Sequence, residues 1–172
     1  MFETRDIKID DKAEFYRELA QQLEALLHGE PDPIANAANT SALLFQTMPD
    51  LNWAGFYLMR DGELVLGPFQ GRPACVRIAV GAGVCGSAVA RRSSVLVEDV
   101  DAFPGHIACD AASRSELVVP LIGPDGVIGV IDLDSPSVAR FDKIDQAGVE
   151  RVAAIYLATC AQGAAPALAK AS

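Results

Sequence analysis

The chain has 172 residues, of which 51% are apolar, and 23 acidic against 14 basic side chains give a net charge of −9. This length suits one domain whose core needs neither disulfides nor a metal, and the charge argues against binding a nucleic-acid backbone. No apolar run could span a membrane, and the charged N-terminus is unlike a secretory signal. We therefore expect a cytoplasmic protein with no nucleic-acid or membrane partner.

Two amphipathic helices are predicted before the first strand. The first covers about residues 10–28, because an aspartate pair can cap it, apolar side chains recur at helical spacing and a glycine follows its end. The second covers about residues 32–48, with an aspartate cap, a proline in its first turn and another proline after its end. Both patterns are typical of helices that bury one face.

Strands predominate after residue 50. Short runs of β-branched and aromatic residues, some joined by Asp-Gly turns, predict strands at residues 53–59, 63–66, 75–80, 95–97, 116–122 and 127–133. A Pro/Gly-rich stretch, GPFQGRP, follows the second of these strands. The other segments are a short helix at 84–91, a polar loop at 98–114 and a final helix at 142–161. Loops as long as this one are often functional.

The order of these elements predicts an α+β fold with an antiparallel sheet, because successive hairpins form antiparallel pairs. No internal repeat, linker or low-complexity segment divides the chain. We therefore expect a single domain over residues 1–172, with its core at about 10–161. The tail at 162–172 is expected to be frayed.

Three cysteines lie in separate segments of the middle of the chain: Cys75, Cys85 and Cys109. Only folding can bring them together, and in a cytoplasmic protein such thiols are more often catalytic or redox-sensing than structural. Cys85 follows GAGV at a predicted helix start, where backbone N–H groups would favour its thiolate. Cys160, in the last helix, is expected to be an inert packing residue.

Three acidic residues follow on strand-like runs: Glu116, Asp132 and Asp134. Asp132 and Asp134 are two apart, so their side chains share a face of one strand. Clustered carboxyls raise one another's pKa, so one of them could keep a proton near neutral pH. Thiols that face such carboxyls favour redox chemistry with acid assistance; the simpler alternative is exposed strand-end aspartates and an ion-paired glutamate.

Five motifs in this order resemble the free methionine-(R)-sulfoxide reductases, which are single GAF-type domains: NWAGFYL, GPFQGRPACVRI, GVCGSA, HIACDAASRSELVVPL and GVIGVIDLDS. The resemblance covers about residues 10–161. It implies a central antiparallel sheet with the terminal helices on one face, and short helices and loops covering a pocket on the other. It also implies reduction of free L-methionine-(R)-sulfoxide to L-methionine.

The resemblance assigns roles to the thiols. Cys109 matches the attacking cysteine, which would become a sulfenic acid, and Cys75 matches the resolving thiol that condenses with it to a disulfide. Cys85 is either a second resolving thiol or a small buried residue beneath the pocket. Thioredoxin, supplied with electrons from NADPH by thioredoxin reductase, would reopen the disulfide.

The same resemblance implies a substrate site. Glu116 and Asp134 are expected near the sulfoxide and Asp132 near the ammonium group. Trp53 and Tyr57, four apart on one strand, would form the wall for the S-methyl group, although ordinary core packing gives the same pattern. Backbone N–H groups around residues 113–115 are candidate donors to the substrate carboxylate.

Other interpretations remain open at this point. His106, with the three cysteines, could be read as a zinc site, but the paired short-range ligands of such sites are missing, so we expect no metal and no bound cofactor. His106 would then shape the loop or raise the thiolate fraction of Cys109. A non-catalytic ligand-binding or redox-sensing GAF module is the functional alternative, and the three carboxyls favour the enzyme. A homodimer paired through the terminal helices is also expected.

Overall fold

The computed structural model describes residue 7, residues 9–105 and residues 111–163, with side chains described as far as Cys160. Within these ranges the elements follow one another as α1 (Lys12–Leu27), α2 (Pro33–Thr47), β1 (Trp53–Arg60), β2 (Glu63–Gly71), β3 (Arg77–Ala79), α3 (Gly83–Arg91), β4 (Val95–Val97), the 3-10 turn η1 (Val100–Ala102), β5 (Ser115–Gly123), β6 (Gly126–Ser135) and α4 (Lys143–Gly163). The predicted helices are all present, and each predicted strand has a counterpart.

The six strands form one antiparallel sheet in the order β3-β2-β1-β6-β5-β4. Its centre is the pair β1 and β6, which are far apart in sequence, while the hairpins β1-β2 and β5-β6 lie on either side. This arrangement confirms the α+β class and the antiparallel sheet expected from sequential hairpins.

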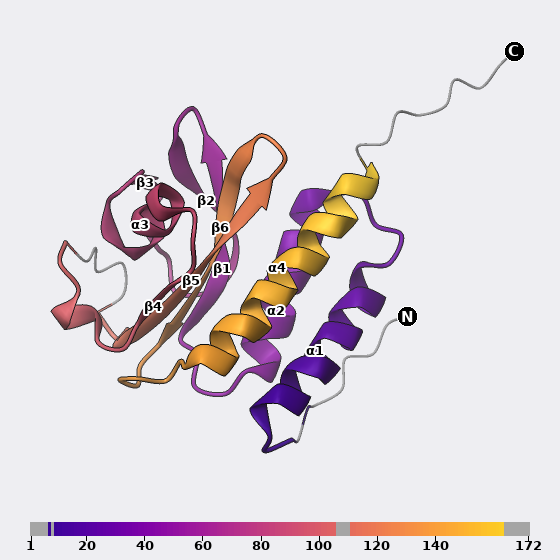
Figure 1. The fold of residues 1–172 in the computed structure, drawn as a ribbon, viewed down its shortest axis with the longest axis horizontal. Helices are drawn as coiled ribbons and strands as arrows, with labels where there is room; N and C mark the ends of the chain where they lie inside the picture. The colour runs from indigo at the N-terminus through magenta and orange to yellow at the C-terminus, as the bar shows by residue number, and fades with distance from the viewer. Residues whose placement is uncertain (1–6, 8, 106–110, 164–172) are drawn as a thin grey trace, which may run out of the picture.

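The sheet is covered on both faces (Figure 1). Helices α2 and α4 pack on one face, and α1 lies outside them, against α4 and α2. Helix α3 lies on the opposite face, against β3, β4, β5 and β6. None of the helices in the described ranges is long and apolar enough to cross a membrane.

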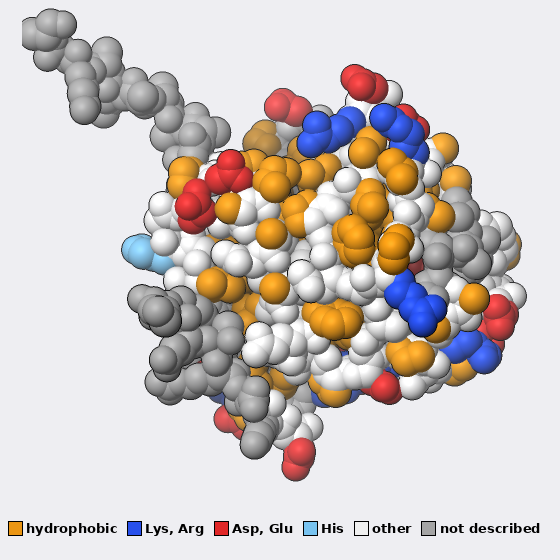
Figure 2. Space-filling model, turned by 180° about the vertical axis from the view of Figure 1, so that it is seen from behind, with side chains coloured by type: hydrophobic (Ala, Val, Ile, Leu, Met, Phe, Trp, Pro, Cys, Tyr) orange, Lys and Arg blue, Asp and Glu red, His pale blue; other side chains and the backbone are white. Residues whose placement is uncertain are grey.

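Strand alternation produces two hydrophobic cores, one on each face of the sheet. Successive side chains point to opposite faces, so Phe56 and Ile131 pack against the helical layer, whereas Tyr57 and Val130 pack toward α3. Figure 2, which views the molecule from behind, shows hydrophobic side chains mixed with other side chains and most acidic groups toward the rim. Among the described residues this face has no broad field of Lys and Arg, in keeping with the acidic composition.

The N-terminal helices begin where their caps predict. The Asp11 side chain accepts a 2.8 Å hydrogen bond from the Glu14 N–H, and Asp32 accepts bonds of 2.9 and 2.8 Å from the N–H groups of Ile34 and Ala35. These bonds satisfy donors that a helix leaves unpaired at its start.

A polar cluster ties α1 to the start of α4. The buried carboxylate of Asp145 accepts hydrogen bonds from the Tyr16 hydroxyl at 2.9 Å and from Lys12 Nζ at 2.5 Å, and Arg140 Nη1 lies 3.3 Å from it. Lys12 also reaches Asp142 at 2.7 Å. The Lys12 hydrogen bond and two backbone N–H donors in the first turn of α4 lower the pKa of Asp142 from 3.8 to about 2, although partial burial opposes this.

Two strand lengths differ from the sequence prediction. β2 continues through the GPFQG segment to Gly71, because this segment pairs with the start of β1, with Trp53 opposite Gly71. A register shift between Gly55 and Tyr57 accommodates the longer strand. β3 is shorter than the predicted 75–80 and covers only Arg77–Ala79.

Candidate active site

Strand pairing brings the three predicted carboxyl groups to one place. Asp134 lies opposite both Glu116 on β5 and Trp53 on β1, and Asp132 lies opposite Gly55 on β1. Residues directly opposite in antiparallel strands project to the same face. All three carboxyls therefore project toward α3, and they line a pocket between α3 and the sheet.

Aromatic rings form one wall of this pocket. The ring of Trp53 stacks between those of Tyr57, at a centroid distance of 5.8 Å, and Phe69, at 5.3 Å. Gly55 makes this stack possible, because a Cβ there would lie 2.4 Å from Phe69 Cβ and 2.7 Å from Trp53 Cη2. Trp53 Nε1 also donates a 3.1 Å hydrogen bond to the Arg72 carbonyl, which holds the indole in place.

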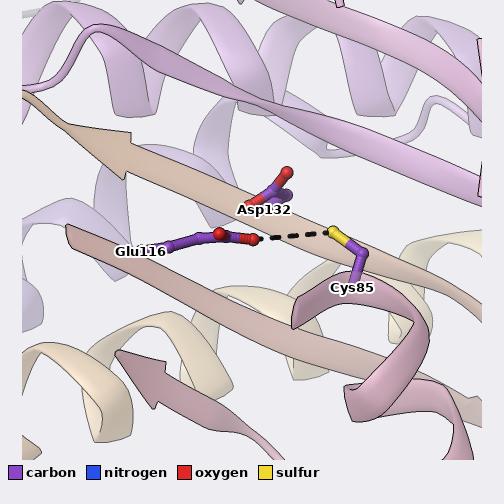
Figure 3. Close-up of side chains that lie close together, drawn as sticks. All are labelled: Cys85, Glu116 and Asp132. Atoms are coloured by element: carbon purple, nitrogen blue, oxygen red, sulfur yellow. Dashed lines mark hydrogen bonds between the residues drawn. The ribbon is translucent and has the colours of Figure 1, made fainter. Parts of the chain in front are cut away.

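Cys85 enters the pocket from the first turn of α3 (Figure 3). Its side chain points from the helix toward the carboxyls of Glu116 and Asp132, and its Sγ lies 4.0 Å from Glu116 Oε1. Helix α3 can approach this closely because residue 86 is a glycine: a Cβ there would lie 2.3 Å from the Ala79 carbonyl oxygen. The predicted proximity of a thiol to the acidic cluster is thus present for Cys85.

Burial and crowding raise the pKa of each of these groups. Glu116 is 6% exposed, and burial followed by the charges of Asp132 and Asp134 raises its pKa well above the usual value. The pKa of Asp132 rises to about 6, mainly through burial, while bonds from Cys85 and Glu116 oppose the rise. Burial and mutual repulsion therefore favour one shared proton on this pair of carboxyls.

We expected a thiolate at Cys85, but its surroundings favour the neutral thiol. Burial raises the pKa of this thiol well above its usual range, and the charges of Asp132 and Glu116 add to the effect. The N-terminus of α3 does not compensate, because the thiol is 3% exposed and faces carboxyls. The sequence showed the helix start correctly but not the acidic groups opposite it.

One oxygen in the pocket has no hydrogen bond within the described structure. Asp132 Oδ1 is buried and makes none, although buried carboxylate oxygens are nearly always satisfied. This atom is therefore free to accept a hydrogen bond from, or to pair with a positive charge on, a molecule bound in the pocket.

The other cysteines are placed as follows. Cys75 is disulfide-bonded and lies next to the aromatic wall, since the Tyr57 hydroxyl donates a 3.0 Å hydrogen bond to its backbone carbonyl. Cys85 and Cys160 are free thiols. Cys109 and His106 lie outside the described residues.

The pocket also contains residues that sequence reasoning missed. Arg72, Ala74 and the first turn of α3 line it, together with Ser113 from the predicted donor loop. The glycines of GAG before Cys85 were the signal for α3, because Gly81 and Gly83 have φ angles of 88° and 58°, a region that favours glycine. Ser115 contributes no hydroxyl to the pocket, since its Oγ donates to the Ser137 carbonyl at 2.7 Å.

Comparisons with known proteins agree with this geometry. The sequence profile of the GAF domain family matches residues 36–156. The free methionine-R-sulfoxide reductase of Escherichia coli is 54% identical over 144 residues, covering 84% of this chain and 87% of that protein. This chain belongs to the free methionine-(R)-sulfoxide reductase family.

Other members of the family extend the likeness. The free methionine-R-sulfoxide reductase of Saccharomyces cerevisiae is 40% identical, covering 87% of this chain and 88% of its own. The X-ray structure of free methionine-R-sulfoxide reductase from Neisseria meningitidis, in complex with its substrate, has a TM-score of 0.91 and 44% identity, and covers 95% of this chain and 98% of that one. The family's GAF fold is therefore present here over nearly the whole chain.

Proposed function

We propose that this reductase converts free L-methionine-(R)-sulfoxide to L-methionine in the pocket between α3 and the sheet. The observation that carries the proposal is the meeting of Glu116, Asp132 and Asp134 with an aromatic wall in one cavity. Such a site offers a proton for the sulfoxide oxygen, a negative charge for the ammonium group and an apolar surface for the methyl group.

Each part of the substrate has a partner in this proposal. The ammonium group binds Asp132, whose buried Oδ1 makes no other hydrogen bond, and the S-methyl group lies against Trp53 and Tyr57. The substrate carboxylate accepts N–H groups from the first turn of α3, which lines the pocket and has no side-chain cap. Preference for a free amino acid then follows, because a peptide-linked residue has neither terminal charge.

Glu116 is the proton donor to the sulfoxide oxygen, with Asp134 beside it. Burial and the neighbouring aspartates raise the pKa of its carboxyl, which favours the protonated form. A sulfoxide oxygen is a poor leaving group, so its transfer needs protonation as sulfur is attacked. General acid catalysis of this kind typically contributes 10²–10⁴-fold to a rate, in order of magnitude.

The thiol chemistry begins at Cys109. Its thiolate attacks the sulfoxide sulfur while the general acid protonates the oxygen. The hydroxyl group then passes from the methionine sulfur to the Cys109 sulfur as the transient S–S bond breaks, which gives methionine and a Cys109 sulfenic acid. Cys75 then attacks the sulfenic sulfur, forming a disulfide and releasing water. The proposal is supported by the disulfide-bonded state of Cys75, because a resolving thiol ends the reaction in a disulfide.

Thioredoxin completes the cycle in this proposal. Its dithiol gives two electrons and two protons to the Cys75–Cys109 disulfide through a mixed disulfide, and NADPH restores it through thioredoxin reductase. Cys85 is kept as the alternative second resolving thiol, but burial raises its pKa, so little of it is thiolate in this state. We extend the proposal to a cytoplasmic, single-domain enzyme that pairs as a homodimer through its terminal helices.

The experiment that tests the function is a thioredoxin-coupled assay with the separate R and S sulfoxides, each free and within a peptide. We expect NADPH oxidation with the free R epimer and little with the other three. Equal rates with both epimers would contradict the stereochemical assignment. Substrate binding without any turnover would instead indicate a non-catalytic GAF module.

A further inference from the structure

Cys85, Glu116 and Asp132 are arranged like the ligands of a metal ion. One ligand atom from each residue lies within 4.8 Å of the other two, and all three residues are buried. They come from three different elements, α3, β5 and β6, and Figure 3 shows them converging on a common point. We call this set the Cys85 triad.

The distances suit a tetrahedral ion. Zinc bonds of about 2.3 Å to sulfur and about 2.0–2.2 Å to carboxylate oxygen place the two ligand atoms roughly 3.5 Å apart. Cys85 Sγ and Glu116 Oε1 are separated by 4.0 Å, so the gap would have to close by only about half an ångström. Rotation of the Glu116 side chain about its χ angles supplies a shift of this size.

A second observation is independent of the spacing. Asp132 is 6% exposed, its Oδ1 makes no hydrogen bond, and the residue lines the pocket. The thiol of the triad is also available when Cys75 is disulfide-bonded, since Cys85 is a free thiol in that state. In the oxidised protein the Cys85 sulfur therefore lies beside Asp132, whose Oδ1 atom has no hydrogen bond.

We propose that the Cys85 triad is a binding site for Zn²⁺, which excludes the substrate from the pocket. A thiolate with two carboxylates selects a borderline ion such as Zn²⁺ over Mg²⁺ or Ca²⁺, which prefer more ligands and oxygen alone. Three protein ligands leave one coordination position open toward the pocket. The ion's charge stabilises the anionic groups that are crowded together there.

The exclusion of substrate rests on the proposed function, whereas the zinc site itself does not. In the proposed function Asp132 binds the ammonium group and Glu116 supplies a proton. An ion bound to both carboxylates removes both interactions at once, so zinc and sulfoxide compete. Zinc would also hold Cys85 as a bound thiolate and prevent it from exchanging with a disulfide.

The zinc site is tested on the oxidised protein with Co²⁺ as a spectroscopic probe for Zn²⁺. We expect a thiolate-to-cobalt charge-transfer band that saturates at one ion per chain and is abolished by added Zn²⁺. Cys85→Ala should remove the band, and Asp132→Asn should weaken binding of both ions by about tenfold or more. Cys160→Ser is the matched control, because it removes a second free thiol of the described residues, and it should leave the band intact.

Two results would overturn the site: no charge-transfer band in the wild-type protein, which needs no variant to fold, or a band that survives in Cys85→Ala. The competition is measured by repeating the Zn²⁺ titration calorimetrically with excess free methionine-(R)-sulfoxide. A weaker apparent zinc affinity supports mutual exclusion. If Zn²⁺ binds through Cys85 with an affinity that the sulfoxide does not change, the metal site stands but the proposed position of the substrate is wrong.

Discussion

The Tyr57 hydroxyl donates a 3.0 Å hydrogen bond to the backbone carbonyl of Cys75. The ring of Tyr57 is part of the pocket wall, while Cys75 is the disulfide-bonded cysteine of the segment that follows β2. A single bond therefore joins the surface on which we place the substrate to the residue that we expect to resolve the sulfenic acid.

Replacing Tyr57 by phenylalanine tests this link. Tyr57→Phe keeps the stacked ring but removes the donor, which should cost about 1 kcal/mol of stability and loosen the Cys75 segment. We expect methionine release in a single turnover to stay near the wild-type rate while the thioredoxin-dependent steady state slows. Tyr156→Phe is the control, because its hydroxyl bonds to the Pro33 carbonyl at 3.2 Å, away from the pocket. If the steady-state rate fell equally in both variants, the Tyr57–Cys75 hydrogen bond would have no specific role in recycling.

The two buried carboxyls should differ in kinetic role. Glu116→Gln removes the protonated donor, so kcat should fall by roughly 10²–10⁴-fold. Asp132→Asn removes the charge opposite the ammonium group and should mainly raise KM, by roughly 10- to 100-fold. Steady-state kinetics with free methionine-(R)-sulfoxide separate the two effects. An unchanged kcat in Glu116→Gln would make this residue a bystander.

Removal of the resolving thiol should limit the enzyme to one turnover. Cys75→Ser should yield about one equivalent of methionine per chain and then fail to recycle with thioredoxin, because the sulfenic acid lacks its partner. Rapid quench followed by amino-acid analysis measures the yield. Cys160→Ser should turn over repeatedly and Cys109→Ser should give no methionine. Full turnover in Cys75→Ser would move the resolving role to Cys85.

The glycine under α3 should be sensitive to a single methyl group. Gly86→Ala would place a Cβ 2.3 Å from the Ala79 carbonyl oxygen, so α3 must move away from β3. We expect a loss of about 1–3 kcal/mol in unfolding free energy and a raised KM, because the first turn of α3 lines the pocket. Gly123→Ala is the control for denaturant unfolding, because its Cβ would lie 3.3 Å from Ile128 Cγ2 and 3.7 Å from the Gly126 carbonyl oxygen, without a severe clash.

The Asp142 carboxylate should stabilise the fold in a defined pH window. Its pKa falls from 3.8 to about 2 on folding, so its contribution is complete above 3.8 and is lost as pH falls through about 2. Asp142→Asn removes this charge but can still cap α4, whose N–H groups bond to Asp142 Oδ1 at 2.7 and 3.0 Å. We expect the urea midpoints of wild type and variant to differ at neutral pH and to converge near pH 2. A difference between the two urea midpoints that does not change with pH would contradict this account.

Sequence alternation was enough to predict the faces of the sheet. Trp53 and Tyr57 were expected on one side of a strand and Asp132 and Asp134 on one side of another, and the pairing of β1 with β6 places all four toward α3. Period-two patterns carry this information because a strand has only two faces. The functional roles of these residues remain predictions.

Features that depend on pairing between distant segments could not be predicted. The GPFQG segment contains two glycines and a proline, which locally favour a loop, yet its pairing with β1 makes it part of β2. The ionisation of Cys85 was missed for a similar reason. Its helix position was visible in the sequence, but the carboxyl groups opposite it come from strands about 30 and 47 residues later.

The division of the molecule into a helical side and a pocket side has a practical consequence. α1, the first helix, and α4, the last, both belong to the layer across the sheet from α3 (Figure 1). A protein or support that packs against the outer faces of these two helices would not contact the residues that line the pocket.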